Sequence, residues 1–396
     1  MKETKFKNTE IGKIPEDWEV RTINSFCSVK TGPFGSMLHA EDYVAKGTPI
    51  VTTEHFKNGI LPLVGKDIPQ VGIEDLKRMS SYTLTKDDIV FSRVGSVDIN
   101  ALVTVRQKGW LFSGRVLRVR PFKQTDSLYL HYGLLKHSVR SDIVSRAVGL
   151  TMASINTKIL GETELSLPPL NEQHRIASAL TSIDNLISSL GKLIEKKKNI
   201  KQGAMQQLLT GKTRLKGFNE PWVEKKLGEV CSVKRGVRVV KRNLTTDGLY
   251  PVYQNTNIPL GYSNQYNVEA NTPFVIIGGS AGQVGICRER YWAADDCAFF
   301  ACHDIYKEYL YYVLLLNQRN ILHNVRTGTI PRLDRTFLSG MLVYISSNIA
   351  EQQAIATILT KMDDEITALE AKKAKYEAIK QGIMQQLLTG KIRLIS

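Results

Sequence analysis

The sequence lacks any apolar run long enough to cross a membrane. Among its longest apolar stretches is LYYVLLL at residues 310–316, far shorter than the roughly 20 residues that a membrane-spanning helix needs. Residues 1–10, MKETKFKNTE, are polar and lack the apolar core of a secretory signal. The five cysteines form no C-x-x-C pair and no even disulfide framework. These absences predict that the chain has no membrane segment, and they favour the reducing cytoplasm as the location.

Acidic residues are scarce relative to basic ones. The chain has 38 Asp and Glu residues against 53 Lys and Arg residues, which gives a formal net charge of +15. A field of that sign attracts polyanions. Nucleic acid is therefore the favoured partner, and a basic surface that is only solvated is the alternative.

Motifs for catalysis and metal binding are also lacking. TGKT at residues 210–213 resembles the end of a P-loop, but position 206 holds glutamine where that motif needs glycine. The glycine-rich stretch IIGGSAGQVG at 276–285 lacks the G-x-G-x-x-G pattern of dinucleotide-binding sites. The cysteines match no zinc-binding spacing. We therefore predict that the chain is not an enzyme and that it binds no metal.

The sequence does contain a long internal repeat. IKQGAMQQLLTGKTRL at residues 200–215 returns as IKQGIMQQLLTGKIRL at residues 379–394. A weaker echo lies near the start of each half, where Trp18 and the following CSVK match Trp222 and a second CSVK. Such self-similarity governs the fold before local detail does. The order is a variable domain, a conserved segment, a second variable domain and a second conserved segment.

Each conserved segment has the apolar pattern of a coiled-coil helix, because isoleucine, leucine and methionine recur at alternating steps of four and three residues. The positions are Ile176, Leu180, Ile183, Ile187, Leu190 and Ile194, and then Ile355, Leu359, Met362, Ile366 and Leu369. Asn348 with Glu351 predicts a capping box at the start of the second helix. Gly211 and Gly390 predict the C-terminal caps.

These patterns predict an α/β protein in which two mixed α/β domains are separated by an antiparallel coiled coil of two long helices, with a pseudo-twofold internal repeat. Each helix would be about 57 Å long. The predicted bounds are 1–168 for the first domain, 169–215 for the first helix, 216–346 for the second domain and 347–396 for the second helix. The two chain ends should be neighbours.

Polar turn residues follow strand-like runs in both variable domains. Arginine forks suit guanine edges, and Asn or Gln amides suit adenine edges, so we predict that these turns read DNA. Ordinary polar turn chemistry is the alternative for each of them. The predicted DNA-binding residues are Ser36, Lys57, Ser92, Arg93, Ser96, Asn100, Arg115, Arg238, Lys241, Arg242, Gln254, Asn255, Asn257, Ser280 and Gln283.

Several sequence features together resemble the specificity subunit of type I restriction-modification systems, over essentially the whole chain. They are LPPLNEQHRIA, EQQAIATIL, the two IKQG-x-MQQLLTGK-x-RL ends, GPFGSMLHAEDY at 32–43 and YPVYQNTNIPLGY at 250–262. The resemblance implies that each variable domain is a target recognition domain that reads one half of a split, asymmetric site in double-stranded DNA. It also implies that the conserved helices act as a ruler and as a docking surface for two modification subunits.

The resemblance further implies that catalysis belongs to other chains. S-adenosylmethionine chemistry is expected in the modification subunits, and ATP and Mg²⁺ are expected in restriction subunits, with no cofactor in this chain. The predicted docking residues are Gly203, Met205, Leu208, Gly382, Met384 and Leu387. Glycine inside a helix costs about 1 kcal/mol relative to alanine, so Gly203 and Gly382 indicate either a kink or close packing of a partner helix. The alternative function is a stand-alone twin-domain DNA-binding scaffold or regulator.

Overall fold

The structure, a computed structural model, describes residues 4–33, 37–63, 67–149, 151–240, 242 and 244–395. The chain folds as two compact units. Unit 1 comprises Met1–Ser189 and Lys373–Ser396, and unit 2 comprises Leu190–Lys372. Each unit therefore combines one variable domain with parts of both conserved segments.

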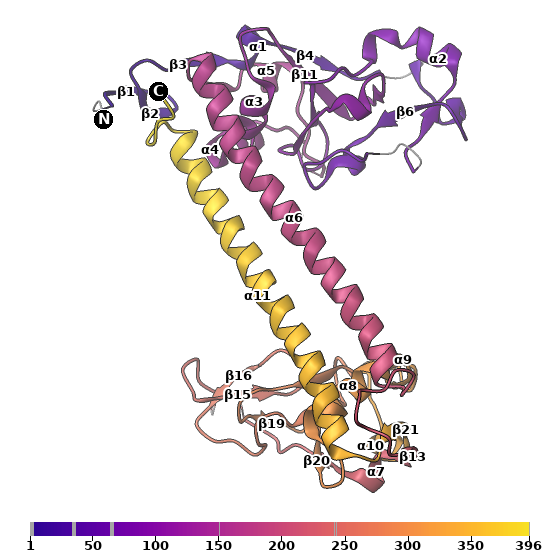
Figure 1. Ribbon diagram of the computed structural model, residues 1–396. Helices are drawn as coiled ribbons and strands as arrows, with labels where there is room; N and C mark the ends of the chain where they lie inside the picture. Colours follow the sequence, from indigo (N-terminus) through magenta and orange to yellow (C-terminus); the bar gives the residue numbers. More distant parts are fainter. Residues whose placement is uncertain are drawn as a thin grey trace. The chain divides into compact units, whose positions relative to one another are not determined.

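The two predicted long helices are present. They are α6, Leu170–Leu208, and α11, Ile349–Leu387, and each has 39 residues. Inside unit 2 the two helices run antiparallel. Lys198 of α6 pairs with Glu370 of α11, whereas Lys201, which comes later on α6, pairs with Asp363, which comes earlier on α11. In unit 1, Lys380 of α11 pairs with Asp184 of α6 at 2.6 Å. The two helices thus pack together within each unit, as predicted (Figure 1). No helix of the described residues is both long and apolar enough to cross a membrane.

The core of unit 1 joins the start of one long helix to the end of the other. Ile176 and Leu180 of α6 pack in the same buried cluster as Met384, Leu387 and Leu388 from the second copy of the repeat. Burying one side chain of this size contributes about 1.5–3 kcal/mol. The first variable domain therefore depends on residues from the far end of the chain.

Unit 2 repeats this arrangement with the two copies exchanged. Ile355 and Leu359 of α11 pack with Met205, Leu208 and Leu209 of the first copy. The predicted seam positions Ile176, Leu180, Ile355 and Leu359 are therefore buried, whereas Ile183, Ile187, Met362 and Leu369 are half-buried. Each copy of the sixteen-residue motif completes the core of the other copy's domain.

Each variable domain is built on a four-stranded antiparallel sheet. The strand order is β4-β11-β8-β9 in unit 1 and β14-β20-β17-β18 in unit 2. The unit 1 strands are Cys27–Thr31, Val116–Pro121, Ile89–Ser92 and Asn100–Leu102, and those of unit 2 are Cys231–Arg235, Cys297–Cys302, Pro273–Ile276 and Val284–Ile286, each in sheet order. The central strands IVFS and PFVI are buried at every position. The repeat therefore includes the variable domains, whose sequences no longer match.

A smaller sheet follows in each domain, with the order β10-β6-β7-β5 in unit 1 and β16-β15-β19 in unit 2. Its strands are Leu111–Phe112, Thr48–Val51, Gln70–Val71 and Tyr43–Val44 in unit 1, and Gly261–Ser263, Tyr250–Tyr253 and Trp292–Ala293 in unit 2. In both, a parallel pair, β6 with β10 or β15 with β19, lies beside the main sheet. The loops that leave β6 and β15 therefore occupy the same place in the two domains.

Short strand pairs and helices complete the fold. The remaining strands are β1 Phe6–Thr9, β2 Gly12–Pro15, β3 Glu19–Thr22, β12 Glu164–Leu167, β13 Trp222–Lys226 and β21 Leu342–Ser346. The shorter helices are α1 Ile23–Phe26, α2 Ile73–Arg78, α3 Ser127–Leu134, α4 His137–Ser145, α5 Thr157–Gly161, α7 Leu227–Val230, α8 Lys307–Leu316, α9 Gln318–His323 and α10 Arg335–Gly340. Strands β12 and β21 each lead directly into a long helix.

The helix caps agree with the sequence in part. Gly211 and Gly390 follow α6 and α11 with φ of 68° and 67°, the left-handed conformation of a C-terminal cap. A side chain at Gly390 would also collide with Pro15, so the chain ends do meet, as predicted. Asn348 accepts hydrogen bonds from the backbone N–H groups of Ala350 and Glu351 at 2.8 and 3.3 Å. The rest of the capping box was wrong, because the Glu351 carboxylate is bound elsewhere.

Each unit contains a buried carboxylate that binds side chains from both copies of the repeat. In unit 1, Glu172 is 3% exposed and accepts from both Nε and Nη2 of Arg393 at 2.8 Å and from Trp18 Nε1 at 3.1 Å. Arg393 also donates to Asp17 at 2.6 and 2.9 Å. The hydrogen bonds that Arg393 donates to Glu172 and Asp17 raise the pKa of its guanidinium above the usual value. The same guanidinium lowers the pKa of Asp17.

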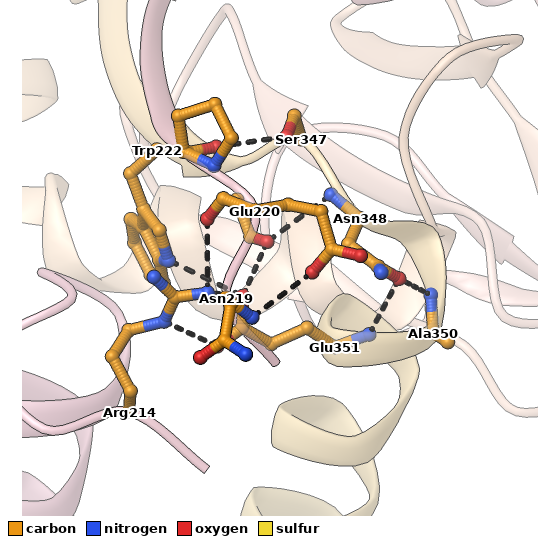
Figure 2. A network of polar contacts seen from close by, with 10 residues as sticks. Arg214, Asn219, Glu220, Trp222, Ser347, Asn348, Ala350 and Glu351 are labelled. Atoms are coloured by element: carbon orange, nitrogen blue, oxygen red, sulfur yellow. Dashed lines mark hydrogen bonds and ion pairs between the residues drawn. The ribbon is translucent and has the colours of Figure 1, made fainter. Parts of the chain in front are cut away.

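In unit 2 the repeat-related arginine and tryptophan make the same contacts to a buried carboxylate (Figure 2). Glu351 is fully buried and accepts from Arg214 Nε at 2.7 Å, from Arg214 Nη2 at 3.0 Å and from Trp222 Nε1 at 3.3 Å. Figure 2 shows this group beside the capped start of α11. In each unit the tryptophan lies near the start of the variable domain, and the glutamate lies in the first turn of the long helix that follows that domain. The arginine lies at the end of the sixteen-residue motif of the other copy.

Replacing Arg393 with methionine should lower the free energy of unfolding of unit 1 by about 3 kcal/mol, because removing one partner leaves the other buried and charged. The double variant R393M/E172Q should recover part of that loss, since no buried charge then remains unpaired. Urea unfolding would measure both.

The matched control is Arg175→Met, since Arg175 is an exposed arginine that donates to Leu394 O at 3.2 Å on the same tail. It should change stability by less than about 1 kcal/mol. An R393M protein as stable as this control, or a double variant as unstable as R393M, would show that the buried pair does not hold the tail.

Candidate nucleic-acid and partner interfaces

An open cleft of about 710 Å³ lies in the first variable domain. One wall is the loop Thr52–His55, which leaves β6 and forms the 3-10 turn Thr53–Phe56. Arg93 and Arg115 line another part of the cleft, from the turns beside β8 and β11 of the main sheet. Arg115 and Glu54 are exposed. The cleft thus presents charges of both signs to a ligand.

The Thr52–His55 loop is held by its own side chains. His55 Nδ1 accepts from the Thr52 backbone N–H at 3.0 Å, so the imidazole proton lies on Nε2. Burial lowers the pKa of His55, which keeps the ring neutral around pH 7. These contacts brace the loop, and Glu54 between them lines the cleft.

Arg93 lines this cleft, but it also supports the surrounding loops. Its Nη1 donates to Gly114 O at 2.8 Å and its Nε donates to Ile155 O at 3.2 Å. Its backbone N–H donates to Arg115 O at 3.0 Å. The structure therefore brings two of the predicted DNA-binding arginines together, with Arg93 positioning the turn that carries Arg115.

Two predicted base readers of the first domain are core residues. Ser92 is 2% exposed and donates to the carbonyl of Ser96, while Asn100 is fully buried with its Oδ1 2.6 Å from His131 Nδ1. Burial lowers the pKa of His131 to about 4, so this pair is neutral. These two predictions were wrong, because strands β8 and β9 turn both side chains inward where no base can reach them. Ser96 itself is exposed.

The predicted readers of the second domain form one cluster. Asn255 accepts at its backbone oxygen from Ser280 N at 2.9 Å, and Asn257 N donates to the side chain of Gln283 at 3.3 Å. Asn255 and Asn257 are exposed, and Gln254 is half-buried beside them in the chain. Four of the five predicted amide and hydroxyl residues are thus brought together by contacts between the loop after β15 and the turn after β17.

The remaining predicted DNA-binding residues lie at the surface or outside the described part. Lys57, Arg238 and Arg242 are exposed. Ser36 and Lys241 lie outside the described residues. Whether any of these side chains contacts DNA remains a prediction.

Comparison of the two domains identifies a loop that sequence reasoning missed. Ser113 N donates to Val51 O at 2.8 Å in unit 1, and Ala294 N donates to Tyr253 O at 2.8 Å in unit 2. Thr52–His55 therefore corresponds to the predicted reading loop 254–257. The one signal in the sequence was the shared proline inside the two strands, TPIV and YPVY.

The corresponding walls of the two domains carry different charges. Arg115 O and Asp296 O accept equivalent hydrogen bonds, from Arg93 N at 3.0 Å and from Ile277 N at 2.8 Å. Asp296 also forms an ion pair of 2.8 Å with Arg332, another residue that the sequence analysis did not single out. The same scaffold position is thus cationic in one domain and part of an ion pair in the other, so the two domains present different chemistry to a ligand.

Two grooves run beside the ends of the long helices at repeat-related positions. The unit 2 groove, of about 850 Å³, lies between α6 and α9, and Gln202 and Gln206 line it. The unit 1 groove, of about 510 Å³, lies between α11 and α4, with Gln381 and Gln385 in its lining. Each unit therefore offers a cleft with the same helix residues on one wall.

The predicted docking residues divide into two kinds. A Cβ atom built at Gly203 or Gly382 would meet nothing within 4 Å, so the backbone of both helices is bare there. Met205 and Met384 form groove floors and are 3% and 7% exposed. Leu208 and Leu387 are 8% and 4% exposed, and they pack with the two methionines in the cores of units 2 and 1. Burial therefore contradicts direct docking for all four apolar residues, and of the six predicted residues the two glycines are the exposed ones.

Comparison with known proteins matches this architecture to one family. Residues 15–202 and 219–381 match the family described as the type I restriction modification DNA specificity domain. The chain is 28% identical to the type I restriction enzyme MjaVIII specificity subunit of Methanocaldococcus jannaschii, over 99% of this chain and 97% of that protein.

Solved structures share the fold. A type I restriction-modification system S subunit from M. genitalium is similar with a TM-score of 0.68 and 19% identity, over 93% of this chain and 96% of that one. A chain from a study of complex assembly and conformational transition of the type I system is similar with a TM-score of 0.54 and 14% identity, over 96% and 99%. Since the family match takes in both variable domains and most of both long helices, the chain belongs to the specificity subunits of type I restriction-modification systems.

Proposed function

We propose that the chain reads a bipartite, asymmetric site in double-stranded DNA and docks two modification subunits. In this proposal the first domain reads one half-site through the cleft at Thr52–His55. The second reads the other half-site through the cluster around residues 254–257. The formal charge of +15 favours the DNA backbone as a partner for both.

The proposal rests on one observation. The two domains share the same buried framework, but the loops on that framework differ. The contacts of Glu172 return at Glu351, and the strand order of the main sheet is the same in both domains. The loops after the equivalent strands β6 and β15 read TTEH and QNTN. A chain that must offer equal surfaces to two copies of one partner, and different surfaces to two DNA sequences, needs this combination.

The chain itself would supply recognition and no chemistry. Methyl transfer from S-adenosylmethionine would belong to the modification subunits, and ATP-driven steps with Mg²⁺ would belong to restriction subunits. The relatives are named specificity subunits, which agrees with that division of labour. The complex would act on DNA in the cytoplasm.

The alternative function is a stand-alone DNA-binding scaffold or regulator. The paired grooves beside bare helix backbone favour the multi-subunit complex, because a regulator that acts alone has no need for two equal docking surfaces. Purification separates the two functions. A specificity subunit should bind its DNA site tightly only with its modification partner, whereas a regulator should do so alone.

Sequencing of methylated bases in cells that express the chain with its modification partner tests the main proposal. The expected result is one asymmetric motif with two specified parts and an unspecified gap. A continuous motif, or the same motif in cells that lack this chain, would contradict the assignment.

Replacing Gly203 with leucine should stabilise α6 slightly, by up to about 1 kcal/mol, while it blocks the approach of a partner helix to bare backbone. We expect loss of one of two modification subunits from the complex. G382L should cause the equivalent loss at the other groove, and the double variant should release both. Native mass spectrometry would give the stoichiometry.

Ser188→Leu is the matched control, since it adds the same side chain to an exposed position of α6 outside the groove. It should leave the stoichiometry unchanged. If G203L and G382L also keep two modification subunits, the grooves are not the docking sites. If S188L alone releases a subunit, docking occurs elsewhere along the helix.

We also propose that the helices set the gap between the half-sites. An insertion of four residues in α6 near Lys196, with a matching insertion in α11 near Leu369, adds about one helical turn, or roughly 6 Å. Each base pair adds about 3.4 Å, so the gap in the methylated motif should lengthen by one to two base pairs while both half-sites stay the same. An unchanged gap would exclude the helices as a ruler.

A further inference from the structure

We propose that Glu54 determines the base at one position of the first half-site by accepting a hydrogen bond from the exocyclic amino group of cytosine. This inference rests on the proposed function. It adds a specificity-determining residue in the first domain, at a place where sequence reasoning found none.

The place of Glu54 in the fold supports a reading role. It lies in the loop after β6, which corresponds to the loop after β15 that carries Asn255 and Asn257. Both loops leave a parallel strand pair, and both face the turn that follows the central strand of the main sheet. Counted from the equivalent residues Val51 and Tyr253, Glu54 stands at the position of Thr256, between Asn255 and Asn257. Equivalent loops in two copies of a domain have the same access to a ligand, so we expect one loop to read bases if the other does.

The chemistry of the Glu54 side chain limits which bases it can contact. The carboxylate is exposed, lines the cleft and has no hydrogen-bond or ion-pair partner within the described ranges. A carboxylate close to DNA is repelled by the phosphates. The carboxylate is tolerated next to DNA only if it accepts a hydrogen bond from a donor on the edge of a base.

Cytosine is the base that fits this requirement. In the major groove cytosine presents the N4 amino donor, whereas adenine presents an N6 donor together with the N7 acceptor. An acceptor-only carboxylate would leave adenine N7 without a donor and place two acceptors face to face. Guanine and thymine present acceptors at the same edge, so Glu54 disfavours both.

The side chain also has support from its neighbours. His55 and Thr52 close the turn through the bond to His55 Nδ1, which holds the backbone on either side of Glu54. Arg115 is exposed in the same cleft and carries the opposite charge. It provides a cation for the phosphate or guanine that would flank the cytosine, which offsets the repulsion of the carboxylate.

The test is E54Q in the complete methyltransferase complex, read out by sequencing of methylated bases. An amide both donates and accepts, and it pairs well with adenine N6 and N7. We expect preference for cytosine over adenine at one position to fall by about tenfold or more, the size of one good base contact. The other positions of both half-sites and the gap should stay unchanged.

Glu74→Gln is the matched control. Glu74 lies on α2 of the same domain, is exposed and pairs with Lys77 at 2.9 Å outside the cleft, so the change removes the same charge without touching the proposed reader. Its motif should equal that of the unsubstituted chain.

Binding of the purified complex to duplexes with each of the four bases at that position completes the test, and it also applies if E54Q methylates weakly. A selective loss for cytosine supports the inference. An unchanged motif, an equal loss for all four bases, or a change in the second half-site would overturn it. If the unsubstituted complex yields no bipartite motif at all, the proposed function fails instead, which keeps the two failures apart.

Discussion

The buried carboxylates of Glu172 and Glu351 are the interactions on which the rest of the structure depends. Each is held by a tryptophan from its own domain and by an arginine from the other copy of the repeat. A buried carboxylate that loses its partner costs several kcal/mol. Each domain is therefore stabilised by the tail of the other copy, and both motif ends carry the Arg-Leu pair that supplies this contact.

This exchange gives the sixteen-residue repeat a structural role in addition to the proposed docking role. Met205 and Leu208 complete the core of unit 2, and their counterparts Met384 and Leu387 complete the core of unit 1. Gly203 and Gly382, on the exposed side of the same helix ends, contribute nothing to those cores. One face of this short motif is thus buried in the core of a unit, and the opposite face is exposed and accessible to a partner.

The same division explains how one scaffold can carry two specificities. The main sheets are buried and repeat their strand order, whereas the loops after β6 and β15 lie at the surface. Changes in such loops leave the buried contacts intact, so binding residues can diverge on a fixed frame. The exposed Glu54 and Asn255 illustrate the outcome, since equivalent loops carry an acceptor-only group in one domain and an amide in the other.

The sequence by itself determined the internal repeat, the two long helices and their glycine caps at Gly211 and Gly390, because helix periodicity and caps are local signals. It also identified the family, and it predicted a reading role for the loop 254–257. Only the tertiary structure decided that Ser92 and Asn100 are buried, that Glu351 binds Arg214 instead of capping its own helix, and that Thr52–His55 is the counterpart of 254–257. Burial and pairing depend on segments far apart in the chain, and no local pattern specifies which segments meet.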